Sequence, residues 1–111
     1  MKISRADKDG IVVLQVSGKL MGGPDADAFD QQVKQILGEG RRKILVDLGD
    51  VSWVNSTGLG ILISNYTTLK NAGGALKLVH TSPRIKQIFT VTKLNTIFES
   101  FDDENAARAS F

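Results

Sequence analysis

The 111-residue chain contains no cysteine and a single histidine, His80. The lack of cysteine excludes disulfide bonds, thiol catalysis and thiolate metal sites. His80 lies at the end of a predicted strand with no second ligand at a useful spacing, so we expect no metal site. A serine nucleophile needs a base within reach, and the chain has no Gly-x-Ser-x-Gly segment. We therefore expect a protein without catalytic residues, cofactor or metal, and not an enzyme.

Long apolar runs and a strong charge of one sign are also absent. No apolar stretch approaches the ~20 residues of a membrane-spanning helix, and segment Met1–Asp9 is too charged to be the core of a signal peptide. We expect a cytoplasmic protein with no direct membrane contact. The net charge is +2, but the 14 basic residues are interspersed with 12 acidic ones. The one tight basic cluster, Arg41–Lys43, is typical of a solvated turn, so we expect no nucleic-acid partner.

Apolar periodicity predicts one α/β domain over residues 1–111. The predicted order is β-β-α-β-α-β-α-(β)-α, a mixed sheet of four to five strands with helices packed on it. No long unprotected edge strand or coiled-coil heptad appears, so we expect a monomer. Strands are predicted at Ile3–Arg5, Ile11–Leu20, Ile44–Leu48, Leu76–His80 and, as a last short strand, Ile97–Phe98. Helices are predicted from Asp25 to Gly38, from Leu59 to Lys70, from Pro83, and from Asp102 or Asp103 to Ala109.

A hydroxyl pair and two glycines lie at the junction between a predicted buried strand and an amphipathic helix. Ser56 falls at the N-cap or in the first turn of this helix, where free N–H groups and the helix dipole favour a negative group. Asn55 already offers a cap. Gly58 and Gly60 each cost about 1 kcal/mol relative to alanine in a helix. Their presence therefore indicates either tight packing or the close approach of a partner, and the junction is our candidate functional site.

This order of elements and these motifs resemble the STAS domain, in particular the free-standing bacterial anti-sigma factor antagonists. The resemblance covers nearly the whole chain, and its most specific element is the Ser-Thr-Gly-Leu-Gly segment at 56–60. The other matching segments occur in the family's order: Gly18–Leu20, Val46–Leu48, Val51–Val54, Leu76–Val79, Val91–Leu94 and Ile97–Phe98.

The resemblance implies a switch that acts through protein–protein contact. Ser56 matches the serine that a partner anti-sigma factor kinase phosphorylates, and Thr57 is the alternative acceptor. In the family, the unphosphorylated protein binds the ATP-binding kinase and so releases the sigma factor, and a serine phosphatase reverses the modification. The expected partner-binding residues are Asn55, Ser56, Thr57, Gly58, Leu59, Gly60, Met21 and Gly22.

Two positions depart from the family's pattern. Asn55 stands where aspartate is usual, and Met21 stands where an acidic residue often follows the leucine. Asn55 removes a negative charge beside Ser56, so a phosphate there meets less repulsion, while recognition by a kinase that reads the carboxylate would change. The alternative function is a STAS regulatory or docking subunit of a transporter or a stress-sensing assembly, without phosphate turnover.

Three nearby residues have more than one interpretation at this point. Trp53 and Val54, which end the strand before the motif, are either half-buried core or an apolar docking rim. Asp47, near the end of a buried strand, either helps to shape the site or pairs with a backbone N–H group. His80 is interpreted as structural.

Overall fold

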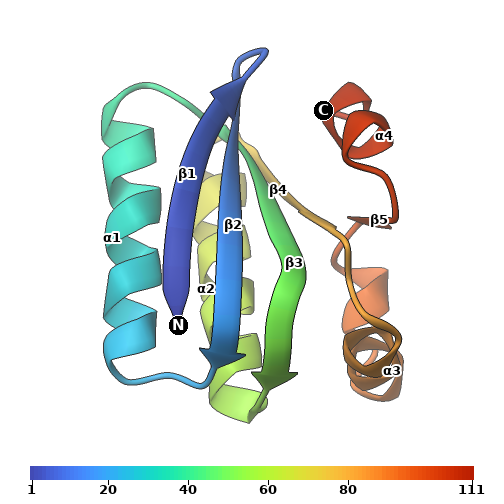
Figure 1. Ribbon diagram of the computed structural model, residues 1–111. Helices are drawn as coiled ribbons and strands as arrows, with labels where there is room; N and C mark the ends of the chain where they lie inside the picture. The colour runs from blue at the N-terminus through green and yellow to red at the C-terminus, as the bar shows by residue number, and fades with distance from the viewer.

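The computed structural model describes all residues from 1 to 111 and contains one five-stranded sheet (Figure 1). The strands lie side by side in the order β1-β2-β3-β4-β5, so neighbours in sequence are also neighbours in the sheet. The strands are β1 (Lys2–Lys8), β2 (Ile11–Leu20), β3 (Lys43–Val54), β4 (Ala75–Val79) and β5 (Ser100–Phe101). The helices are α1 (Pro24–Gly38), α2 (Ser56–Asn71), α3 (Pro83–Val91), a short 3-10 turn η1 (Leu94–Thr96), and α4 (Glu104–Ala109).

The sheet is mixed, as predicted. β1 and β2 form an antiparallel hairpin, and the three remaining strand pairs are parallel. The hairpin turn at Asp9 and Gly10 has positive φ at both residues (56° and 80°), the conformation that matches the twist of the two strands. Each parallel pair requires a crossover, and α1, α2 and α3 lie in the connections.

Most of the core lies on one face of the sheet. Val12, Leu14 and Val16 alternate inward along β2 and join one cluster of 22 buried residues that includes side chains of α1, α2 and α3. The opposite face carries a smaller cluster of five buried residues, to which α4 contributes Ala107 and β2 contributes Val13. The helices therefore cover one face extensively, while α4 covers only part of the other face.

The prediction of a strand at Ile97–Phe98 is wrong. Residues Leu94–Thr96 form the 3-10 turn, and the fifth strand is Ser100–Phe101, which pairs with the end of β4. Phe98 is only 4% exposed and packs against the rings of Phe89 and Tyr66, with centroids 5.7 and 5.2 Å away. Burial of this aromatic side chain, rather than strand pairing, therefore accounts for the apolar pair in the sequence.

β3 is longer than the predicted Ile44–Leu48 and ends at Val54. Its second half remains paired with β2 as far as the Leu20–Val54 pair, with two register irregularities on the way. Gly49, Asp50 and Ser52 are exposed, so this half lacks the apolar run by which the first half was predicted. The extension places the residues that follow Val54 beside the end of β2.

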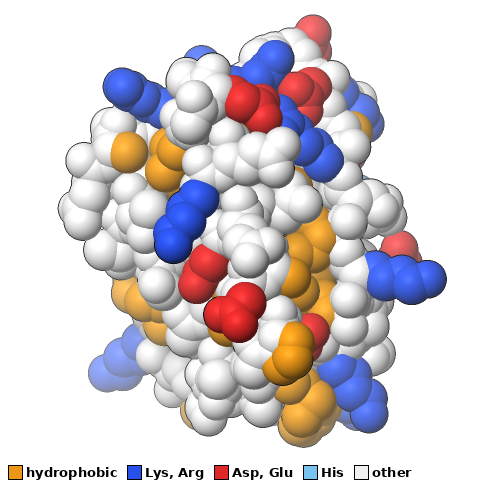
Figure 2. Space-filling view, turned by 90° about the vertical axis from the view of Figure 1, so that its left-hand side faces the viewer, with side chains coloured by type: hydrophobic (Ala, Val, Ile, Leu, Met, Phe, Trp, Pro, Cys, Tyr) orange, Lys and Arg blue, Asp and Glu red, His pale blue; other side chains and the backbone are white.

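Ion pairs gather where β1 ends and α1 ends. The Arg5 guanidinium donates to both Glu39 (2.6 Å) and Asp7 (2.9 Å), and Arg41 lies 3.1 Å from Asp7. Figure 2 shows red and blue side chains intermingled at this upper end of the molecule. Hydrogen bonds from Arg5 lower the pKa of both carboxylates, Asp7 and Glu39, below their ordinary values.

This cluster predicts a pH-dependent contribution to stability. A carboxylate whose pKa is lowered by folding stabilises the folded state above its unfolded pKa, and the contribution is lost as the pH falls through the lowered value. Arg5→Gln should therefore lower Tm at pH 7 relative to the native chain, and the difference should shrink as the pH falls to about 3. Thermal unfolding monitored by circular dichroism measures Tm at each pH. The control Arg42→Gln, at an exposed arginine with no ion pair, should show no such pH-dependent difference. A difference that is the same at both pH values would contradict the assignment.

Candidate functional site

The candidate site lies at the end of the molecule where β2 and β3 terminate and α1 and α2 begin. Figure 1 shows the arrowheads of both strands at the same lower end of the molecule as the first turns of these helices, with α2 directly beside them. The connection from β2 to α1 runs through Met21, Gly22 and Gly23, and the connection from β3 to α2 is the single residue Asn55. Both connections are short, so two rigid strands hold the start of both helices in place.

Direct backbone contact joins the end of β2 to the start of α2. The carbonyl oxygen of Leu20 accepts a hydrogen bond from the N–H of Asn55 at 3.4 Å. The same carbonyl lies against Gly58, where a methyl group would overlap it. Gly58 is therefore required for tight packing, the first of the two reasons that the sequence left open for the paired glycines. Only glycine lets the helix approach the strand this closely without a rearrangement.

Asn55, and not Ser56, is the N-cap of α2. The Asn55 side-chain oxygen accepts a hydrogen bond from the N–H of Gly58 at 2.7 Å, and its backbone is extended, as is usual for a cap. Ser56 is consequently the first helical residue. Its side chain is exposed and its hydroxyl makes no hydrogen bond within the chain. Asparagine at position 55, where the resemblance leads us to expect aspartate, therefore still caps the helix, and the Ser56 hydroxyl is not used for capping.

Thr57 is exposed but is packed against the β2–α1 connection. Gly22 has φ of +103°, and a methyl group at this position would overlap the Cγ2 methyl of Thr57. Gly22 therefore has two reasons to be glycine, its backbone conformation and this contact. Met21, directly before it, has 43% of its surface exposed. The structure thus brings the sequence-distant Met21–Gly22 pair next to the first turn of α2.

Burial divides the eight expected contact residues into two groups. Gly58 and Leu59 are buried, and Leu59 belongs to the main core cluster, so neither presents a side chain to a partner. Gly60 is exposed, and nothing lies within 4 Å of the position that a methyl group would take there. Packing within the chain therefore does not require Gly60, in contrast to Gly58. The accessible surface consists of Asn55, Ser56, Thr57, Gly60, Met21 and Gly22.

The structure also shows what surrounds Asp47 and Trp53, two other residues that the sequence analysis singled out. Asp47 accepts hydrogen bonds from the N–H of Gly49 (2.9 Å) and pairs with Nδ1 of His80 (3.1 Å), so it stabilises the local backbone. The sequence did not reveal the Asp47–His80 pair, because it joins the middle of β3 to the residue that follows β4, 33 residues later in the chain. Trp53 is 42% exposed and lies on the surface beside the site.

The chemistry available at the site is that of a hydroxyl at a helix N-terminus. The first turn of α2 contains no acidic residue, and its leading N–H groups have no acceptor within the helix. A negative group at Ser56 would therefore meet the positive end of the helix dipole. No group of three or more His, Cys, Asp or Glu side chains is arranged to hold a metal ion. None of the helices combines the length and the hydropathy that crossing a membrane requires.

Together, the fold and the site define a small α/β domain that presents a helix N-terminus and an exposed serine at one end of its sheet. The STAS domain family model matches residues 2–107. The chain therefore belongs to the STAS domain family.

Individual relatives share this fold along nearly the whole chain. The anti-sigma-B factor antagonist of Staphylococcus aureus is 34% identical over 99 residues, which cover 87% of this chain and 89% of the relative. The crystal structure of the candidate anti-sigma factor antagonist TM1081 of Thermotoga maritima superposes with a TM-score of 0.88 at 24% identity, covering 97% of this chain and 92% of that one. The phosphorylated form of the Bacillus protein SpoIIAA gives a TM-score of 0.74 at 17% identity, with coverage of 99% and 100%.

The two glycines of α2 predict opposite effects of the same substitution. Gly58→Ala should destabilise the protein by about 1–3 kcal/mol, because the new methyl group must displace the Leu20 carbonyl. Gly60→Ala, the matched control, should stabilise it by about 0.5–1 kcal/mol, because the methyl group meets open space in a helix. Urea denaturation measures both. Equal effects of the same sign would contradict the close approach of β2 and α2.

The N-cap predicts that substitutions of Asn55 change the free energy of unfolding according to how well the new side chain caps α2. Asn55→Ala should lower the free energy of unfolding by about 1 kcal/mol, because the N–H of Gly58 loses its acceptor. Asn55→Asp keeps an acceptor oxygen and adds a charge that the helix dipole favours, so its stability should equal or exceed that of the native chain. Chemical denaturation of the three proteins at neutral pH provides the comparison. No loss in the alanine variant would show that the cap is unimportant for stability.

Proposed function

We propose that this protein is an anti-sigma factor antagonist that acts by reversible binding to an ATP-dependent anti-sigma serine kinase in the cytoplasm. The observation that carries the proposal is the exposed Ser56 hydroxyl, without a hydrogen-bond partner, at the first position of α2. The names of the relatives support the class of function, and the existence of SpoIIAA in phosphorylated and unphosphorylated forms supports a phosphate-based switch. The chain itself would carry out no reaction.

The unmodified surface suits a protein contact. Met21 supplies exposed apolar area, and the uncovered Gly60 allows a partner's backbone to approach α2. Neither Ser56 nor Gly60 is tied into the chain's own packing, so a partner can contact them without rearranging the fold. Gly22 and Thr57 hold the β2–α1 connection against the helix, so the partner would meet a preformed surface.

Phosphorylation of Ser56 would change this surface by charge and bulk. A phosphate adds roughly −1.5 to −2 charges and three acceptor oxygens. The helix N-terminus tolerates this charge within the free protein. In a complex, the phosphate would lose water and would cost several kcal/mol unless the partner supplied a matched cation. The switch therefore needs no refolding of the antagonist, and a serine phosphatase would restore binding.

Ser56 and Thr57 can be separated by matched variants. We expect the partner kinase to phosphorylate the native chain and Thr57→Val but not Ser56→Ala. Thr57→Val keeps the methyl group that packs on Gly22 and removes only the hydroxyl. Peptide mass spectrometry after incubation with the kinase and ATP locates the phosphate. Incorporation that is lost in Thr57→Val and kept in Ser56→Ala would move the site to Thr57.

Binding is tested with the charge-mimicking variant. Ser56→Asp should bind the kinase more than about tenfold more weakly than Ser56→Ala, because the carboxylate occupies the place of the phosphate. Titration calorimetry with the purified kinase measures both affinities. Equal affinities would overturn the switch. If the well-covered peptide also carries no phosphate in cells under any growth condition, the docking-subunit function becomes the better explanation.

A further inference from the structure

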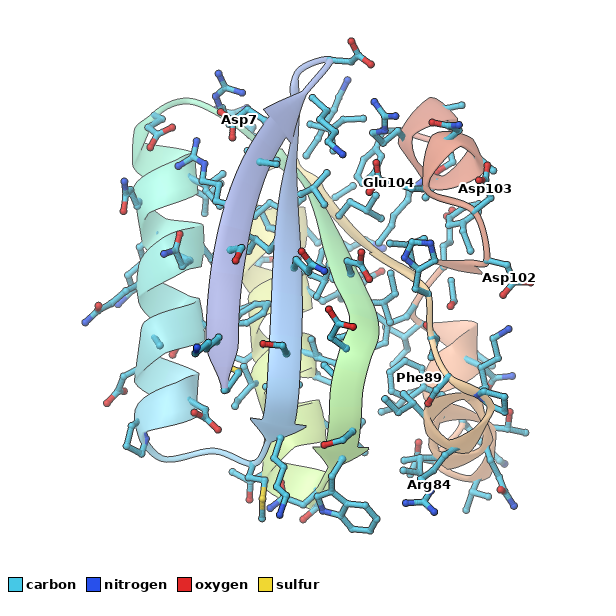
Figure 3. The ribbon with its side chains drawn as sticks, in the orientation of Figure 1. Asp7, Arg84, Phe89, Asp102, Asp103 and Glu104 are labelled. Carbon is cyan, nitrogen blue, oxygen red and sulfur yellow. The ribbon has the colours of Figure 1, made fainter.

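An apolar groove lies beside the candidate site, between the end of β3 and one side of α3. It encloses about 370 Å³ and is lined by Trp53, Arg84, Gln87, Ile88, Val91 and Thr92. Figure 3 shows Arg84 on α3, at the end of the molecule where β2 and β3 terminate. The side chains of Trp53 and Val91 are 42% and 76% exposed, and these are two of the four large hydrophobic residues exposed on the whole chain. Two exposed hydrophobic side chains in one groove provide apolar surface that a partner can cover.

One cation lines the groove, and two others are adjacent to its lining residues. Arg84 lines it, Lys93 directly follows its last lining residue, and Lys19 is the register partner of Trp53 on β2. None of these three cations takes part in an ion pair within the chain. No acidic residue lines the groove. The groove therefore combines an apolar floor with a positively charged border.

The groove is adjacent to the proposed contact surface. Trp53 and Ser56 are separated only by Val54 and the cap Asn55, which connect β3 to α2. A partner that covers Ser56 is therefore placed to reach Trp53 as well. Tryptophan and arginine are the side chains most enriched among residues that dominate binding energy, and both line the groove.

We propose that this groove binds an acidic amphipathic helix of the same partner that contacts Ser56. Apolar side chains of such a helix would pack between Trp53 and Val91, and flanking carboxylates would face Lys19, Arg84 and Lys93. The inference rests on the proposed function, because it assigns a second contact to the same complex. It adds a recognition element that lies on β3 and α3, outside the Ser-Thr-Gly-Leu-Gly segment.

The single tryptophan of the chain makes the groove directly observable, because all tryptophan emission comes from Trp53. The probe is a helical peptide with leucine at positions i, i+3, i+4 and i+7 and glutamate elsewhere, and its counterpart carries lysine in place of glutamate. We expect the acidic peptide to shift the emission to shorter wavelength and to bind at least about tenfold more tightly than the basic one. Absence of a shift, or equal binding of the two peptides, would overturn the inference.

Variants locate the binding. Val91→Asp should lower the affinity for the acidic peptide by about tenfold or more, and Arg84→Gln should lower it severalfold. Ile97→Asp is the matched control, because Ile97 is also 42% exposed but lies outside the groove, so the peptide affinity should not change. Circular dichroism checks that each variant is folded. If Val91→Asp is folded and binds the peptide normally, the groove is not the site.

Three further outcomes test the inference: two separate it from the proposed function, and one separates it from self-association. If Ser56→Asp weakens binding of the kinase while Val91→Asp leaves it unchanged, the switch stands and the groove assignment fails. If peptide and kinase binding both depend on Val91 while Ser56→Asp and Ser56→Ala bind the kinase equally, the groove stands and the switch fails. Sedimentation velocity of the chain alone tests whether a second copy of the chain occupies the groove. A dimer that Val91→Asp dissociates would assign the groove to a second copy and overturn the inference.

Discussion

The contact between the Leu20 carbonyl and the first turn of α2 is the constraint on which the site depends. This one carbonyl accepts a hydrogen bond from the N–H of Asn55 and packs against the bare Cα of Gly58. The contact fixes the start of α2 against the end of β2, while Asn55 closes the helix with its cap. Ser56 is then left on the outside with no structural task. The Ser56 hydroxyl remains exposed because Asn55 provides the cap and Gly58 provides the close packing.

The two ends of the molecule are built differently. At one end, Arg5 and Arg41 are matched by Asp7 and Glu39 in a cluster of ion pairs. At the other end, where β2 and β3 terminate, Met21 and Trp53 are exposed, and the nearby cations Lys19 and Arg84 have no acidic partner. Unmatched apolar and charged groups cost little in an exposed position but gain binding energy when a complementary surface covers them. The partner contact proposed above is therefore placed at the second end.

Much of the architecture could be predicted because apolar spacing has a direct physical meaning. Residues Val12, Leu14 and Val16 alternate because one side of β2 is buried, and the cap at Ser82 follows from its place before Pro83. The error at Ile97–Phe98 has an equally physical cause, since an apolar pair is needed both in a strand and under an aromatic cluster. The sequence alone leaves Ser56 either at the N-cap or in the first turn, because Asn55 and Ser56 are both good caps. Only the observed hydrogen bond from the N–H of Gly58 to the Asn55 side chain identifies Asn55 as the cap.

The sequence by itself determined the order of the elements, the strand–helix junction with its hydroxyl pair, and the resemblance to the STAS family, because these depend on local spacing and residue type. Only the tertiary structure decided which glycine is needed for packing, since Gly58 and Gly60 differ solely in what lies opposite them. It also decided that Trp53 is surface, and it brought Met21, Gly22 and α3 to the same end as Ser56. These properties arise from contacts between residues far apart in the chain, which no local pattern records.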